Sequence, residues 1–211
     1  MILLKSFNKM HLVSAGSPAH LVVILHGFMG FGNNVEELAK AVRQRFGTQA
    51  LVVVPKSFPV LASMDGIDVI AERIAEELRA TVKAHPSLTS ISLVGYSMGG
   101  LIARYLAGSL FVEKPCAFLG LKPINLITIA CPHVGARQAS DRTFATRALL
   151  SLASLVGGRS AAQMTCADGD DFLLAHMACR RSAFARGLGA FARRSAYANT
   201  QNDRTVPCQS T

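Results

Sequence analysis

The sequence has no apolar run long enough to cross a membrane, for which a helix needs about 20 residues. Its best candidates, residues 124–131 and 148–156, are too short. The first residues, MILLKSFNKMHLV, show neither a long apolar segment nor a small-residue cleavage site after one. We therefore expect the N-terminus to form a first strand, and we expect the protein to be cytoplasmic.

Cysteine is present in a pattern that fits neither a disulfide framework nor a zinc site. The cysteines are odd in number, and no C-x-x-C pair occurs among them. Free, reduced thiols in a cytosolic protein are the expected state. No metal ion or other cofactor is expected.

Acidic residues are few: the sequence has 13 Asp and Glu against 22 Lys and Arg, which gives a formal net charge of +9. The arginines are scattered apart from two pairs, Arg180-Arg181 and Arg193-Arg194, and no nucleic-acid-binding motif accompanies them. We do not expect a nucleic-acid partner. A solvated basic surface is one interpretation, and peripheral attraction to an anionic membrane or lipid droplet is the functional alternative.

The 211 residues, half of them hydrophobic, suffice for one domain with a sizeable core. Continuous branched apolar runs predict strands that are buried on both faces, and segments with helical spacing lie between them. The strands are predicted at 20–25, 50–54, 92–94, 124–130 and 194–199. The helices are predicted at 35–46, 67–82, 101–106, 143–156, 172–177 and 183–191, with residues 111–123 irregular. This alternation predicts an α/β fold with an open, doubly wound and mostly parallel sheet.

One stretch, ISLVGYSMGGLIARY, contains a G-x-S-x-G motif between a predicted strand and a predicted helix. That context is typical of a nucleophile elbow, in which a tight turn lifts a serine above the sheet. Gly95 and Gly99 leave room for the turn. Ser97 is therefore the predicted nucleophile, and the N-terminus of the following helix favours developing negative charge.

Four segments follow the carboxyl ends of predicted strands, namely HGFMG, GYSMG, CPHVG and NDRTVP. Ligands of open α/β sheets bind at this edge, so we expect the segments to meet there. Asp203 is the predicted acid of a Ser-acid-His triad. The backbone amides of Phe28 and Met98 are the predicted oxyanion hole, and His26 is expected to brace the first loop.

Histidine is missing where a triad needs it, because none follows Asp203. His133, which leaves a strand end near the site, is the in-chain alternative as base. Losing the histidine of a triad lowers kcat on the order of 10⁶-fold. We therefore expect this chain to be a nearly inactive and C-terminally incomplete hydrolase domain over residues 1–211, whose missing part carries the base.

From His20 to Thr211 the chain resembles the putative serine esterases of the α/β-hydrolase superfamily, a lipase-like group once described as a domain of unknown function. The matching segments are HLVVILHGFMGFGNN, GIDVIAERIAEEL, LVGYSMGGLIARY, ITIACPHVG and FARRSAYANTQNDRTVP. The resemblance implies Ser97 as nucleophile, Asp203 as acid, and acylglycerols, lysophospholipids or other carboxylic esters as substrates. Cys131 replaces the hydroxyl residue that is more usual before Pro-His, and we expect it to change packing only.

Two further hypotheses use the same sequence features. A catalytically inactive hydrolase-fold protein that binds a lipid or a partner would explain the absent histidine. Acyl transfer to an alcohol instead of water would use the same residues as hydrolysis. The leucine-rich helix expected at 143–156 is either core or a lipid-facing cap.

Overall fold

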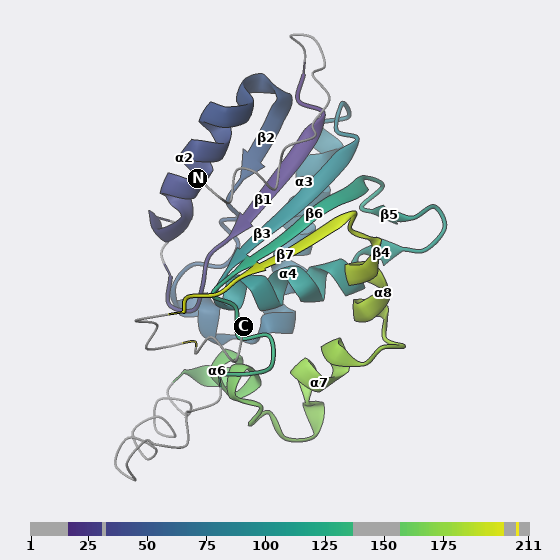
Figure 1. Ribbon diagram of the computed structural model, residues 1–211. Helices are drawn as coiled ribbons and strands as arrows, with labels where there is room; N and C mark the ends of the chain where they lie inside the picture. Colours follow the sequence, from purple (N-terminus) through teal and green to yellow (C-terminus); the bar gives the residue numbers. More distant parts are fainter. Residues whose placement is uncertain (1–16, 31–32, 137–156, 201–205, 207–211) are drawn as a thin grey trace.

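The computed structural model describes residues 17–30, 33–136, 157–200 and 206. Its centre is a sheet of five parallel strands in the order β2-β1-β3-β6-β7 (Figure 1). These strands are β1 (His20–Leu25), β2 (Ala50–Val53), β3 (Ser90–Tyr96), β6 (Lys122–Ile129) and β7 (Arg193–Tyr197). The prediction of an open parallel α/β sheet is confirmed.

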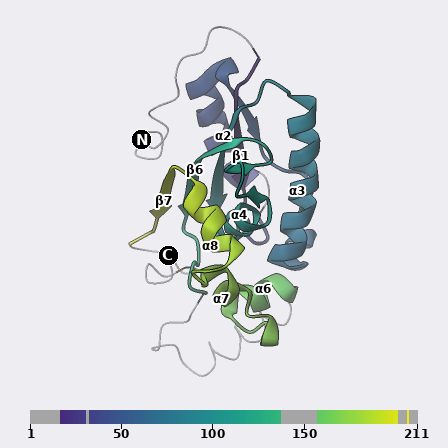
Figure 2. The same ribbon diagram turned by 90° about the vertical axis from the view of Figure 1, so that its right-hand side faces the viewer.

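Helices cover both faces of the sheet, as the continuous apolar strands predict. Along β1, Leu21 and Val23 belong to one buried cluster, whereas Val22 and Ile24 belong to the other. Helix α2 (Asn33–Phe46) packs on the second face, and α3 (Ile67–Ala84), α4 (Met98–Ser109) and α8 (Ala183–Ala190) lie on the first (Figures 1 and 2). Within the described residues no helix is both long and apolar enough to cross a membrane.

The segment between β3 and β7 differs most from expectation. Residues 111–123 contain a short antiparallel pair, β4 (Phe111–Val112) and β5 (Ala117–Phe118), where we expected irregular chain. Gly158 begins a helix that the sequence did not predict, α6 (Gly158–Thr165), and α7 (Leu173–Ala178) follows it. A short 3₁₀ helix also lies in this segment, at Gly169–Asp171, and two others occur earlier in the chain, at Gly47–Gln49 and Leu61–Met64. The expected first strand and the expected helix at 143–156 lie outside the described residues.

Candidate active site

Ser97 stands between β3 and α4 in a backbone conformation that few side-chain-bearing residues adopt, with φ 53° and ψ −125°. Its N–H donates to the carbonyl of Ile129 over 2.8 Å, which ties the turn to β6. A Cβ at Gly95 would collide with the backbone of Gly99 and Gly100, and a Cβ at Gly99 would collide with the carbonyls of Leu25 and His26. The motif therefore folds as the strained elbow that was predicted.

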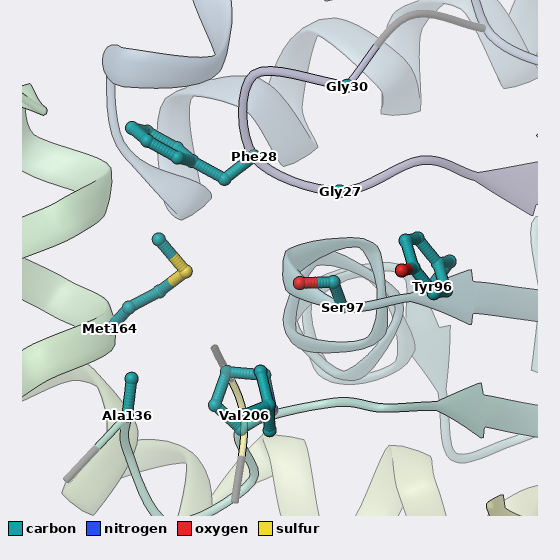
Figure 3. Close-up of a pocket in the computed structure, with 9 residues that line it drawn as sticks. Gly27, Phe28, Gly30, Tyr96, Ser97, Ala136, Met164 and Val206 are labelled. Atoms are coloured by element: carbon teal, nitrogen blue, oxygen red, sulfur yellow. The ribbon is translucent and has the colours of Figure 1, made fainter. Parts of the chain in front are cut away.

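A cavity of about 330 Å³ opens beside Ser97. The Ser97 hydroxyl points into it, and the side chains of Phe28 and Met164 lie on its far side (Figure 3). The described residues that line it are Gly27, Phe28, Gly30, Tyr96, Ser97, Pro132, Ala136, Met164 and Val206. They come from all four predicted segments and from α6, so those segments do meet at one edge of the sheet.

The loop after β1 packs directly against the serine. A Cβ at Gly27 would lie 2.9 Å from Ser97 Cβ, so only glycine allows this approach. His26 is buried; its Nδ1 lies 2.9 Å from the carbonyl of Gly27 and its Nε2 lies 3.2 Å from that of Phe58. Its ring also stacks on Phe58 with centroids 3.8 Å apart. His26 thus braces the loop, as expected.

The two amides predicted to form an oxyanion hole belong to Phe28 and Met98. Phe28 lines the cavity, and Met98 is the first residue of α4, where helix N–H groups have no intrahelical acceptor. Next to Phe28, the amide of Met29 donates to Ser63 Oγ over 3.0 Å, and the Ser63 hydroxyl donates to the carbonyl of Val60. Ser63 is fully buried and fixes this loop, although no local sequence pattern indicated it.

His133 is not among the described residues that line the Ser97 cavity, so the structure does not support the hypothesis that it replaces the base. It lines a different cavity, where Arg104 donates to its Nδ1 over 3.2 Å and to its carbonyl over 3.0 Å. Because arginine only donates, Nδ1 accepts and Nε2 carries the proton, and Nε2 lies 2.8 Å from Thr128 Oγ1 as its acceptor. Burial, followed by the charge of Arg104, lowers the pKa of His133 to about 4.

Cys131, the residue before this Pro-His pair, is fully buried against Gly100 of the elbow helix. Burial raises the pKa of its thiol to about 12. A thiol with that pKa stays protonated at neutral pH and is a poor nucleophile. Cys131 therefore fills space, in agreement with the expectation from the sequence.

Helix α6, which the sequence did not predict, contributes Met164 to the wall of the Ser97 cavity. It is attached to the start of α3, where Gly66 provides no side-chain cap. The Gly66 amide donates to Ser160 Oγ over 2.9 Å, and the Ile67 amide donates to Gln163 Oε1 over 2.6 Å. Both side chains of α6 are buried, so they supply the cap from a distant part of the chain.

Asp203, the predicted triad acid, lies outside the described residues. Val206, three positions later, is buried and lines the Ser97 cavity. Upstream, β7 ends at Tyr197, whose carbonyl accepts from Ala130 over 2.7 Å at the same edge of the sheet. Among the described residues, none of those lining the cavity is a histidine.

Comparison with known sequences gives one family over nearly the whole chain. A profile described as "Putative serine esterase (DUF676)" matches residues 15–211. The "Putative lipase ROG1" of Saccharomyces cerevisiae is 27% identical over 89% of this chain and 27% of its own length. The "Putative lipase YDL109C" of the same yeast is 26% identical over 94% of this chain and 31% of its own length. The chain thus spans less than a third of either relative.

Among solved structures, the RedJ thioesterase of the prodiginine biosynthetic pathway in Streptomyces coelicolor is 21% identical. The likeness covers 88% of this chain and 66% of that one, with a TM-score of 0.41.

Proposed function

Because the chain belongs to the "Putative serine esterase (DUF676)" family of α/β-hydrolases, we propose that it is the catalytic core of an enzyme that hydrolyses carboxylic esters through an acyl-enzyme on Ser97. The observation that carries the proposal is the strained backbone of Ser97, with φ 53°, beside a cavity that its hydroxyl enters. Strain of this kind persists at functional sites, where the surrounding fold enforces it.

In the proposed reaction Ser97 Oγ attacks the ester carbonyl while a base removes the hydroxyl proton. The carbonyl oxygen becomes an oxyanion that accepts from the amides of Phe28 and Met98. Collapse breaks the ester bond, and the alcohol leaves with the proton from the base. Water then attacks the acyl-enzyme in the same way and releases the carboxylic acid and free Ser97. Removing one oxyanion donor typically lowers kcat about 10²–10³-fold.

We assign the role of triad acid to Asp203 and expect its base from sequence beyond Thr211, so that residues 1–211 form one incomplete hydrolase domain. Val206 supports the first assignment, because three residues of extended chain limit the Cα atoms of Asp203 and Val206 to about 11 Å. The second is supported by the described histidines, none of which lines the Ser97 cavity.

Lipid esters, of acylglycerol or lysophospholipid type, are the proposed substrates. The walls of the Ser97 cavity are mostly apolar, with side chains from Phe28, Met164, Pro132 and Val206. The relatives carry the name lipase. Met29 and Tyr96, which are 43% and 40% exposed, belong to two of the segments that meet at the serine. With a net charge of +9, these exposed side chains support peripheral contact with an anionic lipid surface. The free cysteines among the described residues support a cytoplasmic setting.

The experiment is labelling with an alkyl fluorophosphonate, compared between this chain and one extended past Thr211 to include the next histidine. We expect the extended chain to react at least 10³-fold faster, because a triad without histidine loses most of its nucleophilicity. Ser97→Ala should abolish labelling, whereas Ser109→Ala, an exposed serine at the end of α4, should leave it unchanged.

The absence of histidine from the described cavity wall also favours a second candidate, a hydrolase-fold protein that binds a lipid without cleaving it. An extended chain that stays unlabelled, or a label that persists in Ser97→Ala, would reject the esterase proposal. Product analysis with a lipid ester and an added alcohol would separate hydrolysis from acyl transfer, because only transfer yields a new ester.

A further inference from the structure

A second cavity, of about 350 Å³, lies behind the loop that follows β6. Pro132 of this loop lines the Ser97 cavity, whereas His133 and Val134 line the second one. The two cavities thus share one wall. The volume of the second lies in the range of small-molecule sites, about 300–1,000 Å³.

The second cavity is lined by positively charged side chains and by aliphatic side chains. Arg104 and Arg194 line it together with Leu126, Val134, Leu188 and Ala196. None of the described lining residues is acidic. His133 is neutral at pH 7, because burial and Arg104 lower its pKa to about 4. The cavity therefore carries net positive charge against an apolar surface.

Arg104 is 8% exposed, and no carboxylate pairs with it in the part of the chain that the structure describes. Toward the residues that the structure describes, one terminal nitrogen of its guanidinium makes two contacts, both to His133. Arg104 lines the cavity, and its other guanidinium nitrogens make no contact with a carboxylate among the described residues. Buried arginine normally pairs with an anion in bidentate geometry.

Arg194 holds a second guanidinium at the rim of the cavity. One of its terminal nitrogens donates to the carbonyls of Gly189 and Phe191 over 2.9 and 2.8 Å, at the end of α8. These contacts fix the side chain beside the aliphatic wall without neutralising its charge. An anionic ligand would therefore meet a preformed cationic end and would not have to order a flexible one.

From these observations we propose that the cavity behind the Cys131–Gly135 loop binds a monocarboxylate with a short aliphatic chain, whose carboxylate pairs with Arg104. Binding does not require chemistry at Ser97. If Ser97 hydrolyses esters as proposed, the acid that it releases belongs to the class of ligand that this cavity recognises.

The test is a titration of the Ser97→Ala chain, labelled with [¹⁵N]arginine, with hexanoate, followed by NMR. The Nε–H resonance of Arg104, assigned with Arg104→Lys, should shift saturably with hexanoate and not with hexan-1-ol, which has the same chain length and no charge. Val134→Asp should weaken hexanoate binding roughly fivefold or more by placing a negative charge in the cavity. Val134→Thr, of similar size and uncharged, should leave it within twofold.

The proposal is overturned if the Arg104 resonance does not respond to hexanoate, if hexan-1-ol shifts it equally, or if Val134→Asp and Val134→Thr bind alike. Val134 is 63% exposed, so its variants keep the fold even where Arg104→Lys does not. Because the chain used lacks the Ser97 hydroxyl, failure of the esterase proposal would leave this result unchanged.

Discussion

A side chain at position 99 would occupy space that the backbone already holds. The carbonyls of Leu25 and His26 approach Gly99 so closely that the elbow helix and the loop after β1 touch without any side chain between them. The distance between Ser97 and the proposed Phe28 donor therefore depends on the missing Cβ. Displacements of about 1 Å in such a site can lower reaction rates about 10²-fold.

Gly99→Ala should therefore reduce the rate of fluorophosphonate labelling in the extended chain about 10²-fold and destabilise the protein by about 1–3 kcal/mol. Gly189→Ala in α8 is the matched control, because its Cβ meets nothing within 4 Å and should add about 0.4–1 kcal/mol of stability. Urea unfolding and labelling kinetics measure both effects. Equal behaviour of the two variants would mean that the elbow does not need this close approach.

At the scale of elements, α6 determines where one wall of the cavity stands. It is held through buried contacts to the first turn of α3, and the carbonyl of Met164 also accepts from the Ala136 amide over 2.7 Å. Gln163 is 1% exposed; besides the Ile67 amide, it contacts Asp68 Oδ1 at 2.9 Å. Loss of this side chain leaves a helix-terminal amide buried without an acceptor.

Gln163→Leu should lower the free energy of unfolding by about 1–3 kcal/mol, the usual effect of an unsatisfied buried donor. Arg159→Gln, on the same helix, removes the ion pairs of the 45% exposed Arg159 side chain with Asp68 and Asp171, and it should change the free energy of unfolding by less than about 1 kcal/mol. Urea unfolding of the two variants decides between them. If Arg159→Gln proves the more destabilising, α6 is held by its surface charges and not by the cap.

At the scale of the whole molecule, two histidines make stability depend on pH. His20 is 2% exposed, between Ser90 Oγ at 2.7 Å and Ser92 Oγ at 2.9 Å, and burial lowers its pKa to about 4. The pKa of His133 is also lowered to about 4. In the unfolded chain both return to about 6.5. Between pH 6.5 and 4 the unfolded state therefore binds more protons than the native state.

Stability should consequently be complete above about pH 6.5 and should fall as the pH drops toward 4. The contribution of His20 to this loss is at most roughly 3 kcal/mol. His20→Gln removes that contribution, so the variant should lose less stability than the parent chain over the same interval. Urea unfolding at pH 7.5, 6 and 5 measures the difference. Parallel pH profiles would show that His20 does not titrate as its burial requires.

The sequence by itself determined the parallel sheet, the elbow and the meeting of the four loops. These features follow from local rules: continuous branched apolar runs form strands buried on both faces, and parallel strands bring their carboxyl ends to one edge. The strained turn at Ser97 was predictable because glycines stand at both sides of it, where a Cβ has no room. The bracing role of His26 followed from its place at the end of β1.

Only the tertiary structure decided what surrounds Ser97 beyond those loops. Ser160 and Gln163 reach the start of α3 across 94 and 96 positions, and Ser63 reaches Met29 across 34. Such contacts leave no periodicity or spacing in the sequence, because each partner looks like an ordinary polar residue in its own segment. The contacts of His133 likewise could not be read from the sequence. Its position after β6 suggested a base, but it is hydrogen-bonded to Arg104 of α4 and lines the second cavity instead of the Ser97 cavity.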